Sequence, residues 1–321
     1  MKTILKTVLA LIAVSCAVAV LATRWEEVSA VLAGTSWSLL GLAAVGLLAY
    51  QVVNAGVWST VLAALGMRPG FWSAARVWIE SEALRWVPGG IWGYGSRVLS
   101  APSLGVGKGT ASASLVVEII LTNLAWAAAA LLLLGAPWTG EFLEAVLHSG
   151  WIDVAALASA VIVALTVAIL ATRTGRSAAG RLLDPLLRRV PWQELRWRPV
   201  LGAFAAYAAL CFFNGSVLWL TVQAVPGLDI SPLETIGIAG AAWLIGFWAI
   251  GVPGGIGVRE GALAWLLAHS GSLEAGMAVA VLWRALQVVV ELAALGTAAL
   301  TRAIPARRER REFGVLRVFN F

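Results

Sequence analysis

The sequence predicts an all-α polytopic membrane protein with six transmembrane helices and two oppositely oriented re-entrant hairpins, arranged as an inverted repeat. Three observations lead to this prediction. Of the 321 residues, 60% are hydrophobic and only 12% are charged. Several apolar runs approach the length of about 20 residues that a helix needs to cross a bilayer. The string Val-Pro-Gly-Gly-Ile occurs at 87–91 and again at 252–256, once in each half of the chain.

The apolar runs place the expected elements in order along the chain. Six of them are uninterrupted and predict spanning helices near 4–23, 39–65, 112–134, 151–171, 199–224 and 276–301. The first follows Lys2 and Lys6 and is long enough to span, so we interpret it as a signal anchor rather than a cleaved signal peptide. Two further apolar regions, 71–105 and 233–270, carry the repeated string near their middles.

The repeated string should break a helix at membrane depth. Proline lacks an N–H and clashes with the preceding turn, and paired glycines relax the backbone dihedral limits. In hydrocarbon every backbone polar group needs a partner, so such a break is tolerated only where protein or water surrounds it. Matching breaks in the two halves of a membrane protein therefore point to a binding site.

Basic residues set the expected orientation. Arginines crowd the connection 173–198 and the tail 302–311, and the positive-inside rule assigns both, with the N-terminus, to the cytoplasm. Attraction to anionic lipid explains these arginines better than nucleic-acid binding does. The region 71–105 must then enter and leave on the cytoplasmic side, whereas 233–270 opens to the exterior. The resulting inverted repeat is one membrane domain, 1–301, with repeats at about 1–134 and 151–301 and a basic cytoplasmic tail at 302–321.

Arginines and glycines at the two breaks are the candidate substrate-binding residues. A helix that restarts after paired glycines aims free amides and a positive dipole at the midplane, which suits a phosphate when an arginine is near. For Arg259 the alternative is an internal ion pair with Glu260 or Glu291. The expected binding set is Arg85, Gly89, Gly90, Arg97, Gly254, Gly255, Arg259 and Arg284, in which Arg97 and Arg259 bind phosphate and Arg85 and Arg284 assist.

Carboxylates at membrane depth are the second candidate group. Acidic side chains there are rare and face a cavity or a partner. For Glu118 and Glu291 we favour pairing with an arginine over proton carriage. The residues expected to tune charge or carry protons are Glu80, Glu82, Glu118, Glu260 and Glu291. Interhelical hydrogen bonds account for the amides of Gln51, Asn54 and Asn123.

Signatures of enzymes, metal sites and cofactor sites are missing from the sequence. His148 and His269 map to predicted exterior loops, and no HExxH motif, P-loop or buried Ser/His pair occurs. Cys16 and Cys211 lie in apolar runs and are typical of small buried residues. We therefore expect no catalytic residue, no metal and no cofactor.

The two broken regions resemble the transmembrane region of lysylphosphatidylglycerol synthases, a family that includes stand-alone flippase-like proteins. The matching pieces are the stretch from Glu80 through Pro88-Gly89-Gly90 to Arg97, and Val252-Pro253-Gly254-Gly255-Ile256-Gly257-Val258-Arg259-Glu260. The resemblance implies transfer of a lipid between leaflets, such as an aminoacylated phosphatidylglycerol or a polyprenyl-linked glycolipid. The aminoacyl-transferase domain of the bifunctional synthases is not in this sequence, so we expect no lipid synthesis by that route.

The sequence thus predicts a lipid translocase of the cell (plasma or inner) membrane that moves a phospholipid or polyprenyl-linked glycolipid. Membrane lipids are the expected partners, nucleic acid is not, and a homo-oligomer is compatible with the sequence. One alternative is a small-solute or ion secondary transporter that uses the same hairpins, and another is a non-transporting membrane scaffold.

Overall fold

A computed structural model describes residues 25–82, 84, 92–148, 197–249 and 255–316, and all regular elements within these ranges are helices. Four helices contain apolar stretches long enough to cross a bilayer: α3 (Trp37–Ala64), α6 (Lys108–His148), α9 (Trp197–Ala224) and α12 (Leu273–Leu316). They confirm four of the six predicted spans. The other two, 4–23 and 151–171, lie outside the described residues.

Each region that was predicted to be broken forms a pair of short helices. The first helix pair is α4 (Phe71–Glu82) and α5 (Trp92–Ser100), followed by a 3-10 turn, η2 (Ala101–Leu104). The second helix pair is α10 (Pro232–Trp248) and α11 (Val258–Leu267), followed by η4 (Ala268–Ser270). With 12, 9 and 10 residues, α4, α5 and α11 are too short to span a bilayer. Residues 87–91 and 252–254 of the repeated strings are outside the described residues.

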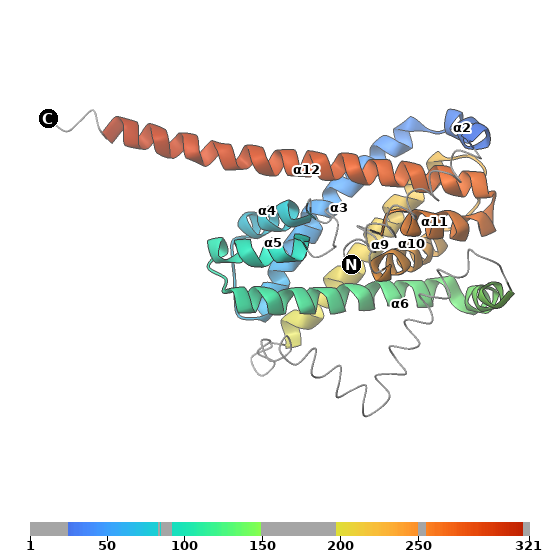
Figure 1. Cartoon of the computed structure of the whole chain (residues 1–321), viewed down its shortest axis with the longest axis horizontal. Helices are drawn as coiled ribbons and strands as arrows, with labels where there is room; N and C mark the ends of the chain where they lie inside the picture. The colour runs from blue at the N-terminus through green and yellow to red at the C-terminus, as the bar shows by residue number, and fades with distance from the viewer. Residues whose placement is uncertain (1–24, 83, 85–91, 149–196, 250–254, 317–321) are drawn as a thin grey trace, which may run out of the picture.

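The four long helices and the two helix pairs form one helical body (Figure 1). Helices α3 and α9 pack along each other through its centre, with α6 on one side and α12 on the other. The first helix pair lies at one end of this arrangement and the second at the opposite end. Helix α10 of the second half packs on α6 of the first half, and α4 of the first half packs on α12. The two halves therefore interlock instead of forming separate units.

Small residues allow the closest helix contacts. A Cβ at Gly240 of α10 would lie 2.8 Å from the carbonyl oxygen of Trp126 in α6, and one at Gly215 of α9 would lie 2.7 Å from the Cα of Ile236 in α10. Between membrane helices, where lipid is as apolar as the side chains, such close backbone packing is a main source of attraction. Glycines thus fix α10 against both α6 and α9.

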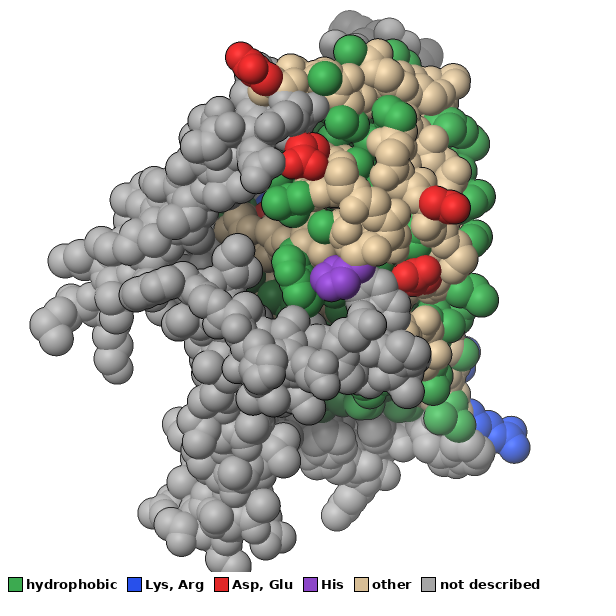
Figure 2. Space-filling view, turned by 90° about the vertical axis from the view of Figure 1, so that its right-hand side faces the viewer, with side chains coloured by type: hydrophobic (Ala, Val, Ile, Leu, Met, Phe, Trp, Pro, Cys, Tyr) green, Lys and Arg blue, Asp and Glu red, His purple; other side chains and the backbone are tan. Residues whose placement is uncertain are grey.

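Apolar side chains cover much of the outer surface. Val45 of α3, Leu132 of α6 and Val289 of α12 are each more than 60% exposed. Figure 2 shows hydrophobic side chains spread over one face, with isolated acidic side chains between them. A soluble monomer rarely exposes so much apolar surface, whereas helices that face lipid do. Helix α12 runs on to Leu316, so most of the predicted tail at 302–321 continues this helix.

Gly240→Ala should separate α10 from α6, because the added methyl group meets backbone rather than a flexible side chain. We expect the free energy of unfolding to fall by about 1–3 kcal/mol. Gly261→Ala is the matched control, since open space surrounds that position in α11, and a helical glycine costs about 0.5–1 kcal/mol relative to alanine. Chemical unfolding in detergent micelles, followed by circular dichroism, measures both. Equal stability of the two variants would contradict the proposed packing.

Candidate functional site

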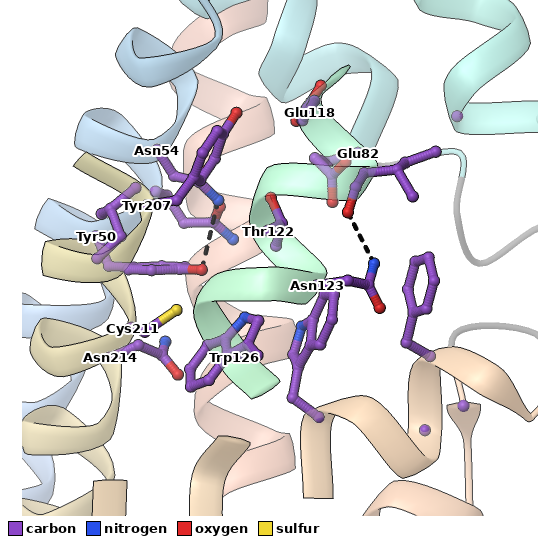
Figure 3. A pocket seen from close by; sticks show the side chains of 18 of the residues that line it. Tyr50, Asn54, Glu82, Glu118, Thr122, Asn123, Trp126, Tyr207, Cys211 and Asn214 are labelled. Carbon is purple, nitrogen blue, oxygen red and sulfur yellow. Dashed lines mark hydrogen bonds between the residues drawn. The ribbon is translucent and has the colours of Figure 1, made fainter. Parts of the chain in front are cut away.

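A cavity of about 260 Å³ lies between the two helix pairs (Figure 3). Its wall comes from α3, α6 and α9 and from both helix pairs, so residues of both halves enclose it. Figure 3 shows polar side chains from three helices around it, with Tyr50 and Asn54 of α3 and Asn214 of α9 on one side and Thr122 of α6 on the other.

Both breaks contribute to this one cavity. In the first half, Gly93 and Tyr94, which follow the repeated string, line it. In the second half, the lining residues are Gly255, which is part of the string, and Arg259, which follows it. Tyr94 and Arg259 hold matching places in the repeat, each three residues beyond the isoleucine of its string. Residues next to both breaks therefore line the same cavity, and a binding site at this place stays a prediction.

Arg97 of α5 is enclosed by protein on all sides. Its side chain is 1% exposed, and it donates to Glu118 in α6 at 2.5 Å and to Glu82 in α4 at 3.1 Å. Its Nε donates to the hydroxyl of Ser81 at 3.0 Å. The guanidinium carbon lies 5.3 Å from the ring centre of Trp58 and 5.4 Å from that of Trp78, within the range of cation–π attraction.

This cluster connects four helices around one positive charge. Trp78 Nε1 also donates to Glu118 at 3.2 Å, so the Glu118 carboxylate has partners on both α4 and α5. Glu82 and Glu118 line the cavity, whereas Arg97 lies behind them. Its three hydrogen-bonded partners leave the Arg97 guanidinium directed at the protein rather than at the cavity. Glu118 has the arginine partner that we favoured for it.

The second half contains an ion pair in which the acid lies on the short helix and the arginine on the long one, the reverse of Arg97 and Glu118. Glu260 of α11 forms an ion pair with Arg284 of α12, in which Oε1 and Nε are 3.2 Å apart. Its other carboxylate oxygen accepts from the backbone N–H of Gly257 at 2.6 Å, at the start of α11. This amide at the helix N-terminus, a predicted place for phosphate, is thus capped by the chain's own carboxylate. Glu260 thus pairs with Arg284, whereas the internal pairs considered for Arg259, with Glu260 or Glu291, stay predictions.

Arg259 reaches the cavity along the end of α10. A Cβ at Gly246 would lie 2.7 Å from Cβ, 3.2 Å from Cγ and 3.4 Å from Cδ of Arg259. A Cβ at Gly255 would in turn lie 2.8 Å from the Gly246 carbonyl oxygen, and Gly255 has φ +68, which favours glycine. Two glycines therefore let the second break and the arginine stem fit against α10.

Aromatic rings form the wall between α6 and α10. Trp126 and Trp243 stack with ring centres 5.7 Å apart, and Trp243 and Phe247 stack at 5.0 Å. Beside them Trp248 donates to the Oδ1 atom of Asn123 at 3.1 Å, while the Asn123 amide donates to the carbonyl of Ile119. These contacts give the cavity flat apolar surfaces next to its polar groups.

The structure brings four of the predicted site residues to the cavity, namely Glu82, Glu118, Gly255 and Arg259. Five others are described but do not line it: Glu80, Arg97, Glu260, Arg284 and Glu291. Arg85, Gly89, Gly90 and Gly254 lie outside the described residues. No cluster of three potential metal ligands occurs among the residues that are described.

Sequence reasoning missed much of the polar wall, above all Tyr207, Asn214 and Thr122. A signal for them exists in the spacing of polar residues inside apolar spans. Tyr207 and Asn214 are seven residues apart and so share a face of α9, and Thr122 follows Glu118 by four on α6. Polar residues at these intervals in a membrane helix indicate a face turned away from lipid.

Arg97→Met should leave Glu82 and Glu118 without their main counter-charge. We expect the free energy of unfolding in detergent to fall by about 3–5 kcal/mol, the usual effect of removing one member of a buried ion pair. The double variant Arg97→Met/Glu118→Met should lose less than the sum of the single variants, because each removes the other's partner. Lys108→Met, at an exposed position of α6, is the control for loss of a positive charge. Additive effects would show that the pair is not coupled.

The chain was also compared with known proteins. No curated protein matches it. The sequence model of the lysylphosphatidylglycerol synthase TM region matches residues 4–296, which include three of the four long apolar stretches, all but the last two residues of the fourth, both helix pairs and the cavity wall. The chain is therefore a multi-pass membrane protein that belongs to the lysylphosphatidylglycerol synthase TM region family.

Proposed function

We propose that this protein is a lipid translocase, which moves a phospholipid or a polyprenyl-linked glycolipid between the leaflets of the cell membrane. The observation that carries the proposal is a partly open cavity, lined by polar and aromatic side chains of both helix pairs, within a body whose outer helices expose apolar side chains. A lipid needs this combination, because its headgroup must leave water while its tails stay in the bilayer. Membership of a family named for a lipid synthase supports the same substrate class.

The two helix pairs supply the alternating access in this proposal. We assign each pair to a re-entrant hairpin, the first open to the cytoplasm and the second open to the exterior, with both termini cytoplasmic. The shortness of α4, α5 and α11 supports this assignment. Because α10 packs on α6 and α4 packs on α12, movement of one half against the other changes the cavity from both sides.

Arg259 contacts the headgroup phosphate in this proposal. It is the arginine among the described residues that lines the cavity, and a guanidinium matches the oxygens of a phosphate. Arg97 keeps Glu82 and Glu118 in place behind the wall instead. These two carboxylates, which border the cavity, are the groups that tune its charge or carry a proton.

Reconstitution into liposomes tests this function. Fluorescent lipids and a quencher confined to the outer leaflet measure the rate of transfer, and Arg259→Gln should lower that rate about tenfold or more, because a hydrogen bond to a charged group is lost. Arg68→Gln removes an exposed arginine outside the cavity wall and should transfer lipid like the wild type. A wild type that transfers no lipid, or an Arg259→Gln variant as fast as the wild type, would refute the proposal. Solute uptake into the same liposomes distinguishes the alternatives. Uptake of a small solute without lipid transfer would favour the secondary transporter, and inactivity in both assays would favour the scaffold.

Cysteine labelling tests the orientation separately. In a variant without Cys16 and Cys211, Ser272→Cys between η4 and α12 should react with an impermeant maleimide from outside the cell. Ser103→Cys in η2 should react only after the membrane is opened, because the first helix pair is expected to start and end in the cytoplasm. Both serines are exposed, so each is accessible to the reagent. Labelling of both from the same side would contradict the inverted arrangement.

A further inference from the structure

Helices α6 and α10 meet along a line, here called the α6–α10 seam, that is closely packed at one end. A Cβ at Gly237 would lie 2.9 Å from Leu134 Cγ, and one at Gly240 would lie 2.8 Å from the carbonyl oxygen of Trp126. Toward the break that follows α10, aromatic rings take the place of these glycines, and Trp126 and Trp243 stack with ring centres 5.7 Å apart. Small residues let two backbones approach and large rings keep them apart. The seam is therefore closed by backbone contact at one end and by side chains at the end next to the break.

A hydrogen bond joins the two helices at this second end of the seam. Trp248, the last residue of α10, donates from Nε1 to Asn123 Oδ1 of α6 at 3.1 Å. The amide nitrogen of Asn123 donates to the carbonyl of Ile119, one turn earlier on α6, so its oxygen is directed at the indole. Asn123 lines the cavity, whereas Trp248 is exposed on the outer surface. The bond thus lies between the cavity and the surroundings of the protein (Figure 3).

The surroundings at this point are the hydrocarbon of the bilayer. Ile120 and Leu124, the neighbours of Asn123 on α6, are apolar and exposed. Asn123 lies near the middle of the apolar stretch Lys108–Leu134, and therefore at the depth of the bilayer core. Exposed tryptophans favour the two interfaces of a membrane, where the indole N–H meets water. At mid-depth the N–H of Trp248 needs a protein acceptor, and Asn123 supplies it.

The same bond is suited to open and close. Hydrogen bonds between membrane helices contribute little stability on average, so one such bond breaks readily. Because α10 ends at Trp248, the indole can move outward without disturbing a following helical turn. Phe247, which lines the cavity, packs edge to face on Trp248 with ring centres 5.6 Å apart. Outward movement of Trp248 therefore uncovers part of the cavity wall to the bilayer.

We propose that the α6–α10 seam is a lateral gate, through which lipid tails extend into the bilayer while the headgroup is in the cavity. The hydrogen bond from Trp248 to Asn123 holds this gate closed. Tails need such an opening because they must stay in hydrocarbon during transfer. The gate rests on the translocase function proposed above and adds to it the place where the cavity opens to lipid.

Cys211 of α9 reports on the gate, because it lines the cavity and is buried. The test uses the full chain with Cys16→Ala, reconstituted in liposomes. Labelling of Cys211 is measured with N-phenylmaleimide, which dissolves in the bilayer, and with a charged maleimide that stays in water. Trp248→Phe keeps an aromatic ring and removes the N–H. We expect this variant to react about three- to tenfold faster than its parent with N-phenylmaleimide, the effect of one interhelical hydrogen bond, and equally fast with the charged reagent.

Two further variants separate the hydrogen bond from other effects. Asn123→Leu removes the acceptor and should accelerate labelling like Trp248→Phe, and the double variant should react no faster than either single variant. Trp219→Phe is the matched control, because Trp219 Nε1 also donates a hydrogen bond, to the carbonyl of Ile230 at 3.2 Å, but is not part of the cavity wall. This control should react like the parent with both reagents.

Unchanged labelling of Trp248→Phe by N-phenylmaleimide would overturn the gate and leave the translocase proposal intact. Equal acceleration by both reagents would indicate a general loosening of the helices and would overturn it as well, as would additive effects of Trp248→Phe and Asn123→Leu. A wild type that transfers no lipid, while Trp248→Phe still reacts selectively with N-phenylmaleimide, would refute the translocase function and support a seam that opens to the bilayer.

Discussion

The burial of Arg97 is the interaction on which the first half of this protein depends. A guanidinium that is 1% exposed inside a membrane protein needs compensation in every direction. Here two carboxylates, a hydroxyl and two indole rings from α3, α4 and α6 supply it. Because its partners come from before and after the first break, the two short helices cannot separate without exposing a charge. Removing either member of such a buried pair would leave a charge without compensation, which favours the one arrangement that keeps them together.

The second half meets the same requirement with the charges exchanged. In the first half, Arg97 of the short helix α5 pairs with Glu118 of the following long helix, α6. In the second half, the acid is on the short helix and the arginine on the long one, because Glu260 of α11 pairs with Arg284 of α12. The residues that follow the repeated strings differ too, since Tyr94 and Arg259 occupy matching places. The fold is repeated, but the chemistry at the cavity is not. The first helix pair presents a phenol to the cavity and the second presents a guanidinium, so the two sides of the cavity differ chemically.

Much of the architecture follows from hydropathy and from the repeated string. Helices of the predicted type occur at all four uninterrupted spans that are described, because about 20 apolar residues in lipid have few alternatives to a helix. The partners of the ionic groups were harder to predict. Arg97 bonds to Glu118 across 21 residues and Glu260 to Arg284 across 24, distances in sequence that no helical periodicity connects.

The polar wall shows the same limit. Single polar residues such as Tyr207 and Thr122 carry little signal in an apolar run, and only the packing of α3, α6 and α9 brings them together. The arginine at the second break was predicted to face the site and lines the cavity. Arg97 at the first break shares its residue type and its closeness to the string, yet it lies behind the wall. Local sequence could not show this for Arg97, because its carboxylate partners lie on α4 and α6.

The fit between Gly246 and Arg259 couples α11 to α10. The first three carbons of its side chain lie against α10, where a single methyl group would collide with them. The absence of a side chain at Gly246 is therefore what allows the stem of Arg259 to pack so closely on α10. The stem of Arg259 thus packs on the end of α10 while the residue itself belongs to α11, so any shift of α11 along α10 would have to move this contact as well.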